Sequence, residues 1–262
     1  MRYRLAAFDV DGTLVGPSGE LSQTTIESLK GLASKGVLVA AATARPHELV
    51  LPTLSPLSGT MDAIIAAAGA DIRHVDGVPI AQIAMPHEAA YSLAKLCDEH
   101  DWQVVAGTAS GVFRRRPRDE ARGPATTISS LVDIPLKETY LIAPFTGPRD
   151  PAFATLDELL RDSPLRGERA LTSSGREIIA ITHINAGKGA GLHRLCDSFG
   201  ITPSEAVAFG DAEVDLPMLK IAGLGVAMGD APPGLRVEAD IVTGTATENG
   251  VSTAIHQIWG PV

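Results

Sequence analysis

The sequence RLAAFDVDGTLV, residues 4–15, begins as a run of small and aliphatic residues and then breaks into two acids. The apolar run is typical of a strand that is buried on both faces. Asp9 and Asp11, followed by Gly12 and Thr13, stand where this strand would leave a sheet. Because Asp, Gly and Thr are also common in turns, the two acids indicate either a solvated turn or an active site.

Two further apolar runs follow, VLVAAAT at residues 37–43 and DAIIAAAGA at residues 62–70. Between the first two runs, Ile26, Leu29 and Leu32 recur at the spacing of one helix face. A strand, a helix and a second strand in this order favour parallel pairing of the strands.

The same alternation returns toward the C-terminus. Strands are predicted at residues 206–210, 224–228 and 240–243, with helices at residues 189–200 and 214–223. The sequence therefore predicts an α/β fold whose core is a doubly wound, Rossmann-like parallel sheet.

The middle of the chain breaks this alternation. Asp76-Gly77 lies between two short apolar runs, which is a strong hairpin signal, and the helices and strands that follow do not alternate regularly. We predict a separate α+β insert at residues 86–181, within a core formed by residues 1–85 and 182–262. The insert carries a basic cluster, which is either a solvated face or a contact for an anion. Its members are Arg114, Arg115, Arg116 and Arg118.

The composition limits the partners of the chain. Its 262 residues include 22 basic and 31 acidic side chains, a formal net charge of -9, so the broad basic surface of a nucleic-acid-binding protein is not expected. No apolar run approaches the roughly 20 residues that span a bilayer, and we expect a cytoplasmic protein without a membrane partner. Cys97 and Cys196 lack the spacing of a metal or redox motif and are predicted to be free thiols. The sequence marks no interface between copies of the chain.

Polar residues follow three of the predicted core strands and also stand near the point where the core resumes after the insert. Ligands of a doubly wound sheet gather at the carboxyl ends of its strands. Acids that share such an edge repel one another unless a cation lies among them, and Mg²⁺ prefers oxygen ligands. We therefore predict that Asp9, Asp211 and Asp215 share a metal site, and that Lys188 and Thr43 hold a phosphate. Taken alone, Lys188 between two glycines favours a solvated lysine, and its place between the motifs reverses that interpretation. Asp215 taken alone fits a helix-start acid about as well as a metal support.

These residues resemble the motifs of the haloacid dehalogenase (HAD) superfamily of phosphohydrolases. Asp9, Asp11, Gly12 and Thr13 match its first motif, D-x-D-G-T, and the large insert between the second and third motifs looks like the Cof-type subclass, HAD class IIB. The resemblance implies an α/β core with an α+β cap domain, and a Mg²⁺-dependent phosphatase acting on a small phosphorylated metabolite such as a sugar phosphate.

The resemblance also implies roles for individual residues. Asp9 would form an aspartyl-phosphate, and Asp11 would protonate the leaving group, deprotonate water and offer its backbone carbonyl to the metal. Asp211 would ligate Mg²⁺ and Asp215 would support it. The implied metal residues are Asp9, Asp11, Asp211 and Asp215, and the implied phosphate-binding residues are Gly12, Thr43, Ala44 and Lys188.

Three positions depart from the family pattern. Val214 stands where the fourth motif usually has Asn, Ala44 stands where the second usually has Gly, and Ala68 replaces an Asn after the third strand. The same residues would also support a phosphotransferase or phosphomutase, and the three departures suggest a phosphometabolite-binding protein without turnover. Asp9 and Asp11 are intact and favour an enzyme, because a pure binder needs neither a nucleophile nor an acid at this spacing.

Overall fold

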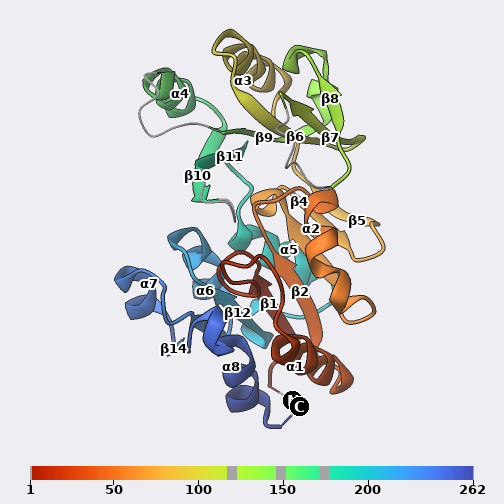
Figure 1. Cartoon of the computed structure of the whole chain (residues 1–262), viewed down its shortest axis with the longest axis vertical. Helices are drawn as coiled ribbons and strands as arrows, with labels where there is room; N and C mark the ends of the chain where they lie inside the picture. The colour runs from red at the N-terminus through yellow and green to blue at the C-terminus, as the bar shows by residue number, and fades with distance from the viewer. Residues whose placement is uncertain (1, 117–122, 146–151, 172–176, 262) are drawn as a thin grey trace.

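A computed structural model describes residues 2–116, 123–145, 152–171 and 177–261, and these residues form two β-sheets placed one above the other along the long axis of the molecule (Figure 1). The lower sheet has eight strands in the order β14-β13-β12-β1-β2-β3-β4-β5. These strands are β1 (Leu5–Asp9), β2 (Leu38–Ala42), β3 (Ala63–Ala66), β4 (Asp71–His74), β5 (Pro79–Gln82), β12 (Ala206–Gly210), β13 (Leu224–Ala227) and β14 (Ile241–Val242).

The lower sheet is parallel from β14 to β3, and only the pairs β3–β4 and β4–β5 at one edge are antiparallel. Helices cover both of its faces. They are α1 (Gln23–Ser34), α2 (His47–Leu54), α5 (Lys188–Ser198), α6 (Leu216–Ile221), α7 (Pro233–Glu238) and α8 (Gly250–Trp259). The predicted doubly wound α/β core is thereby confirmed.

The apolar side chains of β1 alternate between two cores. On one face Phe8 stacks on Phe209 with ring centroids 4.5 Å apart, in a cluster that includes Leu29 and Leu32 of α1. On the other face Leu5 and Ala7 belong to a cluster with Leu192, Leu195 and Cys196 of α5. Both faces of β1 are buried, which explains its unbroken apolar run.

The upper sheet has six described strands in the order β10-β11-β9-β6-β7-β8. They are β6 (Gln103–Thr108), β7 (Gly111–Arg115), β8 (Thr126–Ile128), β9 (Thr139–Phe145), β10 (Leu165–Leu171) and β11 (Glu177–His183). Helices α3 (His87–Glu99) and α4 (Ala152–Arg161) pack with this sheet in a third cluster. The division into a core and a cap domain at residues 85/86 and 181/182 stays a prediction.

The structure differs from the sequence predictions in the middle of the chain. The apolar run at residues 62–70 forms a strand only as far as Ala66, and Ala67–Gly69 is a tight 3₁₀ turn. Strands β7 and β10 were not predicted, and β8 begins inside the predicted loop at residues 116–127. Strands β7 and β10 carry charged residues, which weaken the apolar pattern on which a strand prediction depends.

The basic cluster does not form a simple solvated face. Arg115 is buried, and its guanidinium lies 2.8 Å from carboxylate oxygens of both Asp98 and Asp101. Arg116 is exposed and pairs with Asp101 at 2.7 Å, while Arg118 lies outside the described residues. Arg115 therefore joins β7 to the end of α3.

Both cysteines, Cys97 and Cys196, are free and buried, as predicted. Burial raises the pKa of the Cys196 thiol to about 11, so it is protonated near neutral pH. In the described parts of the chain, no helix combines the length and apolar character needed to cross a membrane.

Candidate active site

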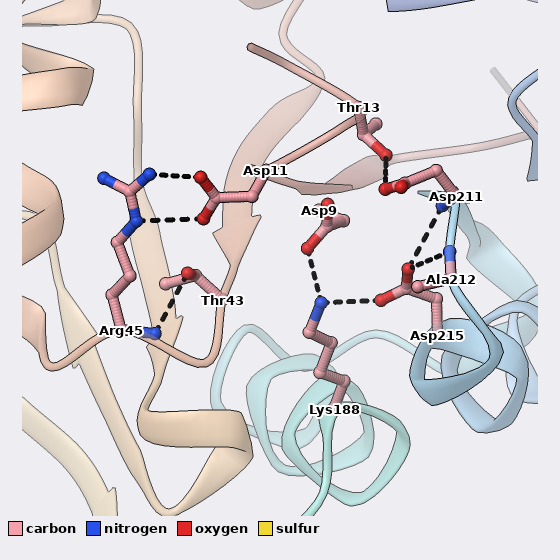
Figure 2. Close-up of polar contacts among 9 residues, drawn as sticks. All are labelled: Asp9, Asp11, Thr13, Thr43, Arg45, Lys188, Asp211, Ala212 and Asp215. Atoms are coloured by element: carbon pink, nitrogen blue, oxygen red, sulfur yellow. Dashed lines mark hydrogen bonds and ion pairs between the residues drawn. The ribbon is translucent and has the colours of Figure 1, made fainter. Parts of the chain in front are cut away.

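The predicted site residues converge at the carboxyl edge of the lower sheet (Figure 2). Strand β1 lies between β12 and β2. Strands β2 to β5 are added on one side of β1, and strands β12 to β14 are added on the other side. A doubly wound sheet opens a crevice where its strand order reverses in this way. Asp9 ends β1, Asp211 directly follows β12, and Lys188 begins α5.

Lys188 lies between two carboxylates. Its Nζ donates a hydrogen bond to Oδ1 of Asp9 and another to Oδ1 of Asp215, the latter over 2.6 Å. All three side chains are buried: that of Asp215 is fully inaccessible, and those of Lys188 and Asp9 are 3% and 7% exposed. Lys188 is therefore not the solvated lysine that its glycine-flanked sequence also allowed.

The remaining oxygen of Asp215 is held by the backbone. Its Oδ2 accepts from the amide N–H of Asp211 at 3.1 Å and from that of Ala212 at 3.0 Å. Asp211 in turn accepts a hydrogen bond from the Thr13 hydroxyl at 3.0 Å. These contacts fix the loop after β12 against the turn that follows β1.

Gly12 makes this contact possible. Its φ is 100°, in the left-handed region that favours glycine, and a Cβ at this position would overlap the Asp211 carboxylate. The glycine of the first motif therefore has a steric role, because it lets Asp211 lie directly against the turn.

Asp9, Asp211, Asp215 and Lys188, which we call the acid–lysine cluster, carry more negative than positive charge. Burial raises the pKa of Asp9 well above its ordinary value, although Lys188 opposes this effect. Burial and the neighbouring Asp215 also raise the pKa of Asp211. Burial alone would lower the pKa of Lys188, but Asp215 and Asp9 together raise it, so the ammonium stays charged. One ammonium leaves the three carboxylates incompletely neutralised.

A divalent cation fits this arrangement. Asp9, Asp211 and Asp215 each offer one oxygen, and the three atoms lie within 4.8 Å of one another. Oδ2 of Asp9 is buried and accepts no hydrogen bond from any described residue. A buried carboxylate oxygen without a donor is costly, and a hard cation would satisfy it while lowering the raised pKa values. These three residues could therefore hold a metal ion.

Asp11 is placed differently from the other acids. Its carboxylate points away from Asp9 and forms a two-pronged ion pair with Arg45, in which Nε donates over 2.9 Å (Figure 2). Arg45 also donates to the Thr53 hydroxyl of α2 at 3.1 Å. The side chain of Asp11 thus lies outside the set that could hold a metal, and a metal contact through its backbone carbonyl stays a prediction.

The loop after β2 carries Thr43 and Ala44. Thr43 is buried, and its hydroxyl accepts from the Arg45 amide at 3.1 Å, while Ala44 is half-buried. No role was predicted for Arg45 from the sequence. The position of Arg45, two residues after Thr43 at the end of a strand, could have identified it as a site residue. Nothing in the local sequence indicates that Asp11 is its partner.

A strained turn supports the start of α5. Ala67 and Ala68 have φ values of 49° and 51°, which are uncommon for residues other than glycine. Their amides donate to Arg45 O at 2.8 Å and to Thr43 O at 2.9 Å. Gly69 follows with a φ of 87° so close to the backbone of Gly187 that a Cβ would overlap it. The turn therefore braces the residue that precedes Lys188.

Val214, at the position where Asn was expected, is half-buried in a 3₁₀ turn at Glu213–Asp215. Its neighbour Asp215 keeps the contacts to Lys188 and to the Asp211 amide without help from residue 214. The acid–lysine cluster is therefore assembled despite the missing Asn.

Two residues of β10 that were not predicted as site residues also approach the site. Arg166 donates to the backbone carbonyl of Ala186 at 3.2 Å and pairs with Glu168, whose side chain is buried. No local pattern identified them, because β10 itself was not predicted.

The chain belongs to a known hydrolase family. Residues 6–255 match the family model for haloacid dehalogenase-like hydrolases. The chain is 29% identical to the HMP-PP phosphatase of Yersinia pseudotuberculosis, in an alignment that covers 97% of this chain and 94% of that protein.

Solved structures agree with this assignment. A HAD subclass IIB sugar phosphatase superposes with a TM-score of 0.84 at 25% identity, covering 98% of this chain and all of the other. A HAD phosphatase from Bacteroides thetaiotaomicron has a TM-score of 0.80 and 26% identity, with coverage of 99% and 96%. The predicted superfamily and enzyme class, a HAD-type phosphatase of subclass IIB, are confirmed.

Proposed function

We propose that this chain is a Mg²⁺-dependent phosphatase that hydrolyses a small phosphomonoester through an aspartyl-phosphate on Asp9. The observation that carries the proposal is the state of Asp9. It is buried at the end of β1, one oxygen bonds Lys188, and the other has no described donor. A buried carboxylate with one oxygen on an ammonium and the other without a donor can bind a metal ion through one oxygen and attack phosphorus through the other.

In the first step an oxygen of Asp9 would bond to phosphorus while the bond to the leaving-group oxygen breaks. Asp11 would donate a proton to that oxygen, so we expect Asp11 to leave Arg45 and carry a proton when substrate binds. In the second step Asp11 would take a proton from water, whose oxygen attacks phosphorus and frees Asp9.

The other residues would stabilise charge and position the phosphoryl group. Gly12, Thr43, Ala44 and Lys188 would hold its oxygens, and the ammonium of Lys188 would offset their charge. Asp9, Asp211 and Asp215, with the backbone carbonyl of Asp11, would hold Mg²⁺. When bound, Mg²⁺ would supply positive charge beside the transferred group.

The names of the relatives support a substrate class for this chain. Proteins similar to this chain are named HMP-PP phosphatase and sugar phosphatase, which supports a small phosphorylated metabolite, such as a sugar phosphate, as the substrate. We propose that residues 86–181 act as a cap domain that covers the site and excludes water. A cytoplasmic location stays a prediction.

The test is phosphate release from a panel of phosphorylated sugars, polyols and nucleotides, with Mg²⁺ and with EDTA. We expect Mg²⁺-dependent release that Asp9→Asn reduces by at least about a thousand-fold. Asp76→Asn, in the exposed hairpin turn between β4 and β5, is the matched control and should keep full activity. Release that survives Asp9→Asn would contradict the proposed nucleophile. Transfer of phosphate to an added alcohol in place of release would favour a phosphotransferase.

A further inference from the structure

One face of β10 and β11 is directed toward the acid–lysine cluster. These antiparallel strands pair Arg166 with Thr182 and Glu168 with Ala180, and directly opposed residues share a face. Ala180 belongs to an apolar cluster with Ala67, Ala68 and Ala186 of the lower part of the molecule. Figure 1 shows β11 running down from the upper sheet toward α5. Arg166, Glu168 and Thr182, which we call the β10–β11 triad, therefore lie on the side that meets the site.

Contacts at the start of α5 place the triad beside Lys188. Arg166 bonds the carbonyl of Ala186, and a Cβ on Gly187 would lie 3.0 Å from its Nη1. Burial raises the pKa of Glu168, while Arg166 and, more weakly, Lys188 act to lower it. Arg166 thus lies against the two residues that precede Lys188.

Two atoms of the triad are buried without a partner. Thr182 is fully buried and Glu168 is 7% exposed, yet Thr182 Oγ1 and Glu168 Oε2 have no hydrogen-bond partner among the described residues. Native proteins rarely leave such atoms unsatisfied, because each costs about 1–3 kcal/mol. Their position on one face beside a phosphatase site indicates a ligand group that supplies the missing bonds.

We propose that the β10–β11 triad is a specificity subsite that binds hydroxyl groups of the substrate's leaving group, with Glu168 as acceptor and Thr182 as donor or acceptor. The inference rests on the proposed phosphatase function and deepens it, because it selects polyhydroxylated monoesters, such as sugar or polyol phosphates, as substrates.

The charges of the triad favour hydroxyl groups over a second anionic group. Arg166 neutralises Glu168, so the pair has no net charge with which to attract an anion. The unpartnered carboxylate oxygen accepts hydrogen bonds and cannot donate one while ionised. A hydroxyl group can donate to Glu168 and still accept from Thr182, which satisfies both atoms at once.

The experiment compares kcat/KM for a hexose phosphate, tested for several isomers, with kcat/KM for p-nitrophenyl phosphate, whose leaving group has no additional hydroxyl. The ratio of the two values measures recognition of the leaving group and cancels effects on the phosphoryl step. We expect Glu168→Gln and Thr182→Val each to lower this ratio about ten-fold, as for one lost hydrogen bond. Thr182→Val is nearly isosteric and removes an unpartnered hydroxyl, so its thermal unfolding midpoint should stay close to that of the wild type.

Glu177→Gln is the matched control. Glu177 belongs to β11 but lies on the opposite face of the strand from Thr182, the face that carries Ile179 and Ile181 of the upper core. Glu177→Gln should therefore leave the ratio of the two kcat/KM values unchanged. An unchanged ratio in both triad variants, or a wild type that cleaves only p-nitrophenyl phosphate, would overturn the subsite while the phosphatase function stands. A wild type that cleaves neither class would overturn the proposed function and this inference with it.

Discussion

Lys188 is the residue on which the charge balance of the site depends. Its ammonium is the partner of both Asp9 and Asp215 in a buried setting. Lys188→Met keeps most of the apolar stem and removes the charge, so three carboxylates would face one another. We expect this variant to lose about 3 kcal/mol of unfolding free energy at pH 8 in EDTA, measured by denaturant titration.

The pH dependence and a second lysine provide the controls. Burial raises the pKa of Asp9, so this carboxyl is more readily protonated at pH 5, and the loss in Lys188→Met should be smaller there than at pH 8. Lys220 pairs with Glu238 at 2.9 Å on the surface, and Lys220→Met should cost less than about 1 kcal/mol. Equal losses in the two variants would show that Lys188 does not balance buried charge.

The 3₁₀ turn at Ala67–Gly69 links the end of β3 to the start of α5. Gly69→Ala would bring a methyl group against the backbone of Gly187, at a φ that already disfavours a side chain. Gly36 ends α1 with a similar φ of 78°, but a Cβ there meets nothing within 4 Å. We expect Gly69→Ala to cost about 3 kcal/mol or more of unfolding free energy, and Gly36→Ala about 1 kcal/mol.

The two glycine variants should also differ in activity. Because Gly187 precedes Lys188, we expect Gly69→Ala to lower kcat for phosphate release at temperatures where it is still folded, while Gly36→Ala keeps the wild-type value. Full activity in folded Gly69→Ala would mean that the turn only stabilises the fold and does not position Lys188.

The local sequence predicted elements well where burial is simple. Strand β1 and helix α1 follow from an unbroken apolar run and a 3.6-residue period, because one is buried on both faces and the other on one. Strand β10 was not predicted, because Arg166 and Glu168 lie on a face that meets the site instead of an apolar core. Their charges remove the apolar pattern by which a strand is recognised. Contacts between distant segments, such as Asp11 with Arg45, are set by the fold and leave no local pattern.

Across the whole molecule, the predicted convergence of Asp9, Asp211 and Asp215 depended on one topological fact, that parallel strands end at one edge. Lys188 follows β11 of the upper sheet, and its prediction depended on its place between the motifs. The topological fact brings together residues some 200 positions apart without any information on side-chain direction. It therefore predicted that these groups meet, but it did not predict that Lys188 bridges two acids or that Asp11 turns toward Arg45.

Excess negative charge in the acid–lysine cluster should couple metal binding to global stability and to pH. In the folded chain the pKa values of Asp9 and Asp211 are raised. Without metal, the free energy of unfolding therefore falls as the pH rises from the ordinary carboxyl pKa through these raised pKa values. Mg²⁺ binds the ionised form and competes with protons. We therefore compare the two pH values at one Mg²⁺ concentration, a hundred times the Kd at pH 8. We expect this concentration to raise the thermal unfolding midpoint by about 5–10 °C at pH 8 and by less at pH 5.

Calorimetry or fluorescence-monitored melting in MgCl₂, and in NaCl of equal ionic strength, measures this coupling. Ionic strength alone screens surface charges and should not reproduce the shift. Asp211→Asn, which keeps the Thr13 contact possible but removes one charged ligand, should abolish most of the Mg²⁺ effect at pH 8. A shift of equal size at both pH values, or in NaCl, would show that the three carboxylates do not bind the metal as a charged set.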